Sequence, residues 1–105
     1  MRVLLKARLD TAASNRHIQQ GTLGPTMKSV MEELKPETAY FTLENGKRTA
    51  YLFLNIQDAS EIPKIVEPFM LALGAEVEVT PAMTAEDLGK AMASIESAAK
   101  KYGAK

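Results

Sequence analysis

The residues of this sequence that could do chemistry are a few aromatic, cationic and acidic side chains that share no known catalytic motif. Tyr40, Tyr51 and Asn55 fall in one predicted hairpin, whereas Arg8 and Glu78 fall in two other predicted strands. Together they offer rings for stacking, a cation for an acid and an amide for orientation. The sequence therefore predicts a site for a small aromatic or carboxylated ligand at Arg8, Tyr40, Tyr51, Asn55 and Glu78, although packing between two subunits explains side chains of this kind more simply.

Three glutamates are candidate bases. Abstraction of a proton requires a carboxylate that is buried and has a raised pKa. Glu44 lies beside a turn and Glu76 begins a strand, so we expect both to be solvated. Glu78 is the best candidate of the three, although balancing the charge of Arg8 explains it more simply.

The single histidine, His17, lies in a polar stretch without a carboxylate at helical ligand spacing. A solvated surface histidine explains it better than a catalytic or haem-binding one. One histidine and no cysteine cannot build a usual zinc site. We therefore predict no metal and no cofactor.

Charge and composition exclude several classes of partner. Lys+Arg and Asp+Glu are both 13, so the formal net charge is zero. This balance, together with the lack of the aromatic pattern of RNA-recognition modules, argues against nucleic acid. No apolar run is long enough to cross a membrane or to act as a signal peptide. We expect one cytoplasmic domain, residues 1–105, that contacts neither nucleic acid nor membrane.

The candidate residues depend on a predicted hairpin, residues 37–58, that turns at Asn45-Gly46. Both central residues of a type I′ turn need φ > 0, which Asn and Gly adopt most readily. This register places Tyr40 opposite Tyr51 and divides the side chains between two faces. The apolar face, which we expect helices to cover, holds Ala39, Phe41, Leu43, Ala50, Leu52, Leu54 and Ile56. The mixed face holds Thr38, Tyr40, Thr42, Glu44, Lys47, Thr49, Tyr51, Phe53 and Asn55.

The remaining patterns predict two strands and three helical stretches around this hairpin. Residues 2–10 and 75–80 alternate as strands, and the former brings Lys6 and Arg8 to the mixed face. Helix is expected from about Ser14, with an interruption at residues 21–25, and again after Asp58 and after Thr84, which begin capping boxes. Apolar stripes on these helices include four methionines that we expect in the core: Met27, Met31, Met70 and Met92.

The predicted order is βαββαβ with an appended C-terminal helix, which is the pattern of a ferredoxin-like α+β fold with an antiparallel sheet. Right-handed crossovers place the strands in the spatial order four-one-three-two. Helices on one face leave the mixed face for water, a ligand or a second subunit. We predict a homodimer, with Tyr40, Thr42, Tyr51 and Phe53 as interface candidates.

Four segments resemble an uncharacterised bacterial family of small proteins: K-P-E-T-A-Y-F, G-K-R-T-A-Y, I-P-K-I-V-E-P-F and P-A-M-T-A-E-D-L. The fold of that family is similar to the dimeric α+β barrel superfamily, whose members pair two ferredoxin-like sheets face to face. Some members are isomerases or cofactor-independent oxygenases, some degrade haem and some only bind ligands. The resemblance implies a homodimer more firmly than any reaction.

Two functions remain open from the sequence. The first is a homodimer of unknown role that is non-catalytic or binds a small ligand between its sheets. The alternative is a cofactor-independent isomerase or oxygenase that acts on a small aromatic or lactone-like substrate through Arg8, Tyr40, Tyr51 and Glu78. An enzyme requires a pocket with a titratable group drawn inside it, whereas a binding protein does not.

Overall fold

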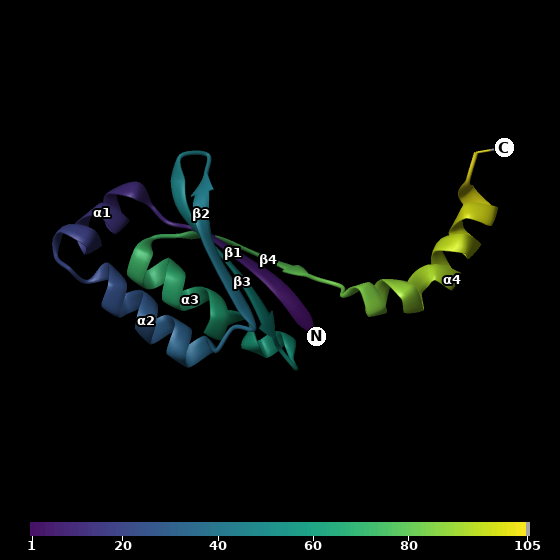
Figure 1. Ribbon diagram of the computed structural model, residues 1–105, viewed down its shortest axis with the longest axis horizontal. Helices are drawn as coiled ribbons and strands as arrows, with labels where there is room; N and C mark the ends of the chain where they lie inside the picture. Colours follow the sequence, from purple (N-terminus) through teal and green to yellow (C-terminus); the bar gives the residue numbers. More distant parts are fainter. Residues whose placement is uncertain (105) are drawn as a thin grey trace.

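A computed structural model describes residues 1–104 as an α+β ferredoxin-like fold (Figure 1). A four-stranded antiparallel sheet has the order β2-β3-β1-β4, as predicted. Its strands are β1 (Arg2–Arg8), β2 (Thr38–Glu44), β3 (Lys47–Asn55) and β4 (Glu76–Pro81). The helices are α1 (Thr11–Gln19), α2 (Leu23–Leu34), the short 3₁₀ helix η1 (Ala59–Glu61), α3 (Ile62–Leu73) and α4 (Ala85–Tyr102).

The β2–β3 hairpin has the predicted turn and register. Asn45 and Gly46 both have positive φ, 52° and 75°, as a type I′ turn requires. Glu44 pairs with Lys47, and Tyr40 pairs with Tyr51. Because side chains alternate along a strand, this pairing determines which residues share each face of the sheet.

The core lies between the sheet and the helices α2 and α3. Alternate residues of β1 and β3, such as Leu5 and Leu52, are fully buried against α3 residues that include Phe69 and Leu73. Gly74 ends α3 with φ of 58°, a left-handed conformation that glycine adopts without steric cost. The capping boxes predicted at Asp58 and Thr84 are both present. Helix α1 starts earlier than predicted, because the Asp10 carboxylate caps it by accepting from the Ala13 N–H at 2.8 Å.

Part of the apolar face of the hairpin is not covered, contrary to the prediction. Phe41 and Leu43 are 61% and 70% exposed, because α2 packs over β1 and β3 and leaves the outer half of β2 bare. The expectation for two methionines was also wrong: Met70 and Met92 are exposed, whereas Met27 and Met31 pack against the core.

Helix α4 projects away from the sheet, which gives the molecule extents of 60 × 29 × 21 Å (Figure 1). None of its residues is buried, and its apolar stripe faces solvent at Leu88, Met92, Ile95 and Tyr102. Within residues 1–104, no helix combines the length and the apolar character that crossing a membrane would need.

The buried ring of Phe69 is the clearest test of this core. We expect Phe69→Ala to lower the free energy of unfolding by about 3–5 kcal/mol, because it removes a fully buried ring and leaves a cavity. Leu71→Ala on the same helix is the matched control, since Leu71 is 82% exposed and its loss should cost no more than about 0.5 kcal/mol. Urea denaturation followed by circular dichroism measures both, and equal effects would contradict the packing described.

Candidate functional site

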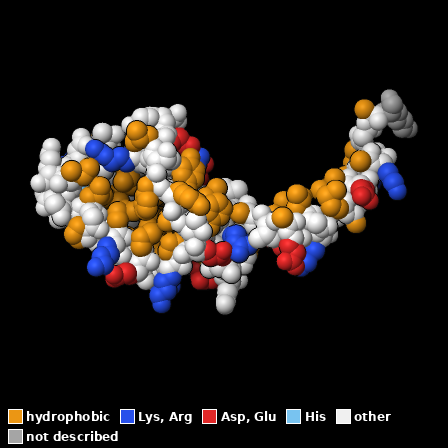
Figure 2. Space-filling model, in the orientation of Figure 1, with side chains coloured by type: hydrophobic (Ala, Val, Ile, Leu, Met, Phe, Trp, Pro, Cys, Tyr) orange, Lys and Arg blue, Asp and Glu red, His pale blue; other side chains and the backbone are white. Residues whose placement is uncertain are grey.

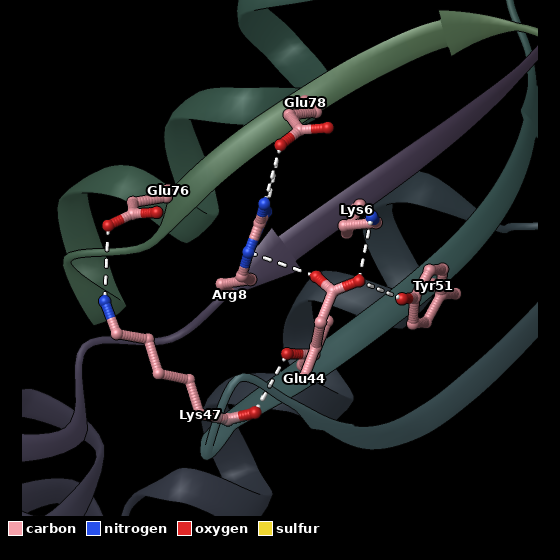
Figure 3. Close-up of polar contacts among 8 residues, drawn as sticks. Lys6, Arg8, Glu44, Lys47, Tyr51, Glu76 and Glu78 are labelled. Atoms are coloured by element: carbon pink, nitrogen blue, oxygen red, sulfur yellow. Dashed lines mark hydrogen bonds and ion pairs between the residues drawn. The ribbon is translucent and has the colours of Figure 1, made fainter.

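The charged residues of the mixed face converge near the turn end of the sheet (Figure 3). Lys6 and Arg8 project from β1, Glu44 and Tyr51 from the hairpin, and Glu78 from β4. We call these five side chains the mixed-face cluster. All four strands contribute to it, so only the assembled sheet can bring the five together.

Glu44 is the centre of the mixed-face cluster. Its Oε1 accepts hydrogen bonds from the Lys6 Nζ at 3.0 Å and from the Tyr51 hydroxyl at 2.8 Å. Its Oε2 is buried and lies 3.1 Å from the Arg8 Nε in an ion pair that lacks hydrogen-bond geometry. The expectation that Glu44 would be solvated was therefore wrong.

Arg8 joins Glu44 to the edge of the sheet. Its two terminal nitrogens donate to Oε1 of Glu78 at 2.9 Å and 2.7 Å. The Arg8 side chain is only 16% exposed, whereas that of Glu78 is 57% exposed. Glu78 balances the charge of Arg8, as the simpler interpretation of the sequence held, and it is the more accessible partner.

The pKa shifts within the cluster follow from these contacts. Hydrogen bonds from Lys6 and then Tyr51 lower the pKa of Glu44, because they stabilise its charged form. The hydrogen bond to Glu44 raises the pKa of Lys6 and also raises the pKa of Tyr51. A general base needs the opposite changes, a raised carboxyl pKa or a lowered tyrosine pKa. In this state the cluster is suited to holding charge in place and poorly suited to removing a proton.

The sheet register explains why Glu44 reaches β1. Strand β3 lies between β1 and β2, the strand that bears Glu44. On β3, Tyr51 pairs with Lys6 of β1 and Thr49 pairs with Arg8 of β1. Thr49 is small and 3% exposed, and we attribute its burial to the Glu44 side chain that passes over it. A larger residue at this position would block the contact between Glu44 and Arg8.

Two of the residues predicted for the ligand site lie outside the cluster. Asn55 is at the far end of β3, where its side-chain oxygen accepts from the N-terminal ammonium group at 3.0 Å. Tyr40 pairs with Tyr51 across the hairpin but is 62% exposed. The structure thus brings Arg8, Tyr51 and Glu78 together, adds Tyr40 as a neighbour and leaves Asn55 apart.

The residues predicted for a dimer interface occupy the mixed face on the hairpin. Tyr40 and Thr42 are exposed, whereas Tyr51 and Phe53 are half-buried.

Lys6 also lies over the Tyr51 ring, with Nζ 5.4 Å from the ring centre, which favours a cation–π contact.

His17 is more than a solvated surface residue, contrary to the prediction. It is half-buried, and both ring nitrogens have partners: Nδ1 lies 2.8 Å from the Thr22 hydroxyl and Nε2 lies 2.9 Å from the Ala72 carbonyl. Because a carbonyl only accepts, Nε2 must bear the proton and donate to it. The ring therefore links the α1–α2 turn to α3.

The remaining acidic candidate, Glu76, is exposed and paired with the Lys47 ammonium at 3.2 Å. Among residues 1–104, no three His, Cys, Asp or Glu side chains are placed to hold a metal ion together.

Sequence reasoning placed Lys6 on the mixed face and considered Glu44 as a solvated base, but it did not predict their contact, and it missed Arg48 altogether. Arg48 pairs with Leu43 on the apolar face and donates to the hydroxyl of fully buried Ser14 at 2.6 Å. Strict alternation along β3 would have placed Arg48 on that face. No comparable signal in the sequence reports the contact of Glu44 with Lys6, because it depends on how two separate strands align.

The order of strands and the helices on one face define a ferredoxin-like α+β protein. No protein-family model matches the chain, and no curated protein sequence is significantly similar to it. A solved structure that is similar to it is the 5-chloro-2-hydroxyhydroquinone dehydrochlorinase TftG from Burkholderia phenoliruptrix AC1100, in complex with 2,5-dihydroxybenzoquinone. The TM-score is 0.63 at 18% sequence identity, and the match covers 82% of this chain and 97% of that chain.

A weaker likeness is to the de novo designed protein Ferredog-Diesel, with a TM-score of 0.46 at 13% identity, covering 77% of this chain and 85% of that chain. At 18% identity, the likeness to TftG establishes the fold of this chain.

We expect Glu44→Gln to destabilise the protein at neutral pH, because Lys6 and Arg8 lose a charged partner. The folded-state pKa of Glu44 is below its unfolded value, so its contribution is complete above the unfolded pKa of about 4.3 and is lost as the pH falls through the folded-state pKa. Urea denaturation should therefore show a difference between wild type and variant at neutral pH that shrinks in acid.

Glu96→Gln, on the exposed face of α4, is the control and should show little difference at either pH. A difference for Glu44→Gln that stays constant from neutral pH into acid would contradict the role of its charge.

Proposed function

We propose that this protein is a homodimer that binds a small aromatic or carboxylated ligand between the mixed faces of two sheets. The mixed face supports this, because α2 and α3 pack on the opposite face and leave half-buried Tyr51 and Phe53 without a covering layer. A sheet face that is half apolar favours either a partner or a ligand over water.

The observation that supports a ligand most directly is the unequal burial of the two carboxylates on Arg8. Glu44 holds the guanidinium from the inner side, while the outer contact is made by Glu78, which is 57% exposed. A carboxylate or phenolate of a ligand presents the same kind of oxygen as Glu78 and can form the same paired hydrogen bonds. Binding would then exchange one acid for another on a cation that is already in position.

Tyr51 and Tyr40 support an aromatic ligand. The Tyr51 hydroxyl is held by Glu44, which fixes the ring, and Tyr40 lies directly across the hairpin with most of its ring in solvent. A ring held as that of Tyr51 is loses little conformational entropy when another ring stacks on it. TftG was solved with 2,5-dihydroxybenzoquinone, so that molecule is a reasonable first probe for this fold.

The alternative function is a cofactor-independent isomerase or oxygenase that acts on a small aromatic or lactone-like substrate. One observation favours it: Oε2 of Glu44 is buried and, although it lies 3.1 Å from the Arg8 Nε, it accepts no hydrogen bond, so one acceptor of this carboxylate is unused. The lowered pKa of Glu44 opposes proton abstraction, which is why we place ligand binding first.

The exchange of acids on Arg8 makes a prediction about affinity. Titration calorimetry with benzoate, salicylate and 2,5-dihydroxybenzoquinone should find a ligand whose binding is lost in Arg8→Ala and strengthened several-fold in Glu78→Gln, because the variant no longer competes for the guanidinium. Arg16→Ala, at an exposed position of α1, is the matched control and should bind as wild type.

Weaker binding in Glu78→Gln would contradict the exchange and would make Glu78 itself a ligand contact. Conversion of the bound molecule, followed by NMR and lost in Tyr51→Phe, would favour the enzyme.

The homodimer has its own test. Light scattering after size exclusion should give twice the mass of one chain for the wild type. The Tyr40→Asp variant should give the mass of a single chain, because the substitution adds a charge to the proposed interface. Tyr40 is exposed in the single chain, so circular dichroism should stay unchanged. Leu71→Asp places the same charge on the helix side and should remain a dimer. A wild-type monomer at micromolar concentration would refute this proposal.

A further inference from the structure

Two apolar surfaces of the chain have no partner within residues 1–104. The first is the stripe of α4, in which Leu88, Met92 and Ile95 are each more than 40% exposed and Tyr102 is 76% exposed. These residues and Ala99 follow one another at spacings of four, three, four and three, which gives a narrow seam on a helix. Most of the stability of a helix in a protein comes from packing its apolar face, so such a seam favours a partner.

The second surface is a groove of about 350 Å³ between α2 and the hairpin. Its apolar lining includes Leu9, Leu23, Met27, Phe41 and Ala50. Phe41 and Leu43 continue it along the bare side of β2. In Figure 2 hydrophobic side chains gather on the body of the molecule and again in a row along α4. We call this surface the α2–β2 groove.

We propose that α4 packs into the α2–β2 groove of a second copy of the chain, so that the two copies exchange their C-terminal helices. The inference rests on the homodimer proposed above and adds to it a second contact on the helix side of the sheet.

The chain's own groove is out of reach of α4. Strands β4 and β2 are at opposite edges of the sheet, three strand spacings or about 14 Å apart. Ala82 still donates to the Arg2 carbonyl, so only Met83 and Thr84 remain as a free connection before α4. The helix side of β4 is already occupied by α3, which blocks the direct path.

A second copy removes this obstacle. Two sheets that meet face to face about a two-fold axis parallel to their strands place β4 of one copy beside β2 of the other. Thr80 of β4 and Thr38 of β2 lie at the same level of the sheet. Thr80 pairs with Leu4 of β1, Leu4 pairs with Phe53 of β3, and Phe53 pairs with Thr38. Helix α4 of one copy would therefore begin where the partner's β2 begins, and it could run along the bare side of that strand.

Length, area and charge are consistent with this placement. An 18-residue helix is about 27 Å long, close to the roughly 23 Å of β2. The dimer would have two contacts of α4 with a partner's groove. Together they would bury on the order of 1,000 Å² of accessible surface, summed over both copies, which is near the lower bound for a specific interface. The acidic first turn of α4, with Glu86 and Asp87, would lie beside exposed Lys35 of the partner, which precedes β2.

Single-cysteine crosslinking tests this exchange cleanly, because the chain has no cysteine of its own. Phe41→Cys and Met92→Cys are mixed as full-length proteins, treated with a short bismaleimide and analysed by intact mass, which distinguishes the two chains. We expect a mixed Phe41→Cys–Met92→Cys product at least tenfold above the background set by Leu71→Cys mixed with Met92→Cys. All three positions are exposed in the single chain, so each variant should fold.

Other outcomes overturn the exchange. A product of Met92→Cys alone would mean that α4 pairs with α4, and an internal link in the double variant Phe41→Cys/Met92→Cys would mean that α4 closes on its own chain. A dimer by light scattering without a mixed product would refute the exchange and leave the homodimer intact, whereas a monomer would refute both. As a second measurement, Ile95→Glu should weaken the dimer at least tenfold, and an unchanged dissociation constant would contradict the exchange.

Discussion

The turn at Asn45-Gly46 sets the register of β2 on β3, and most of the structure depends on that register. A two-residue turn with positive φ at both positions permits one alignment of the flanking strands. That alignment places Leu52 and Leu54 on the face that α3 covers, and Tyr51 and Phe53 on the face that it does not. A shift of one residue would exchange these two sets and remove both the core and the mixed face.

The ligand site that we propose at the mixed-face cluster would be a nearly neutral group of charges. Lys6 and Arg8 are balanced by Glu44 and Glu78, so no net field attracts a ligand from a distance. The ion pairs differ in exposure, however, and the outer one is the pair that water or a ligand can replace. Since Glu44 stays ionised and Tyr51 stays protonated, the cluster keeps its charges fixed, which suits recognition better than proton transfer.

Surfaces that remain bare are as informative as those that are covered. The single chain buries one face of β1 and β3 almost completely, yet it leaves Phe41, Leu43 and the whole seam of α4 in solvent. In the exchange of helices that we propose, a two-fold partner would cover both of these apolar surfaces.

The sequence by itself determined the elements that local physics controls. Turn chemistry at Asn45-Gly46 predicted the hairpin register, capping residues Asp58 and Thr84 predicted helix starts, and alternation along β1 placed Lys6 and Arg8 on the mixed face. The order of the strands followed from the handedness of the connections.

Only the tertiary structure decided which exposed positions meet and which apolar ones stay bare. Glu44 reaches Lys6 and Arg8 across β3, a contact between residues far apart in sequence that no local pattern reports. Phe41 and Met92 lie in apolar patterns of the same kind as those of buried residues. Helix α2 does not extend over Phe41, and α4, which bears Met92, packs on nothing within residues 1–104. The physical reason is that hydrophobic periodicity states which side of an element prefers to be buried, whereas only the arrangement of elements supplies something to bury it.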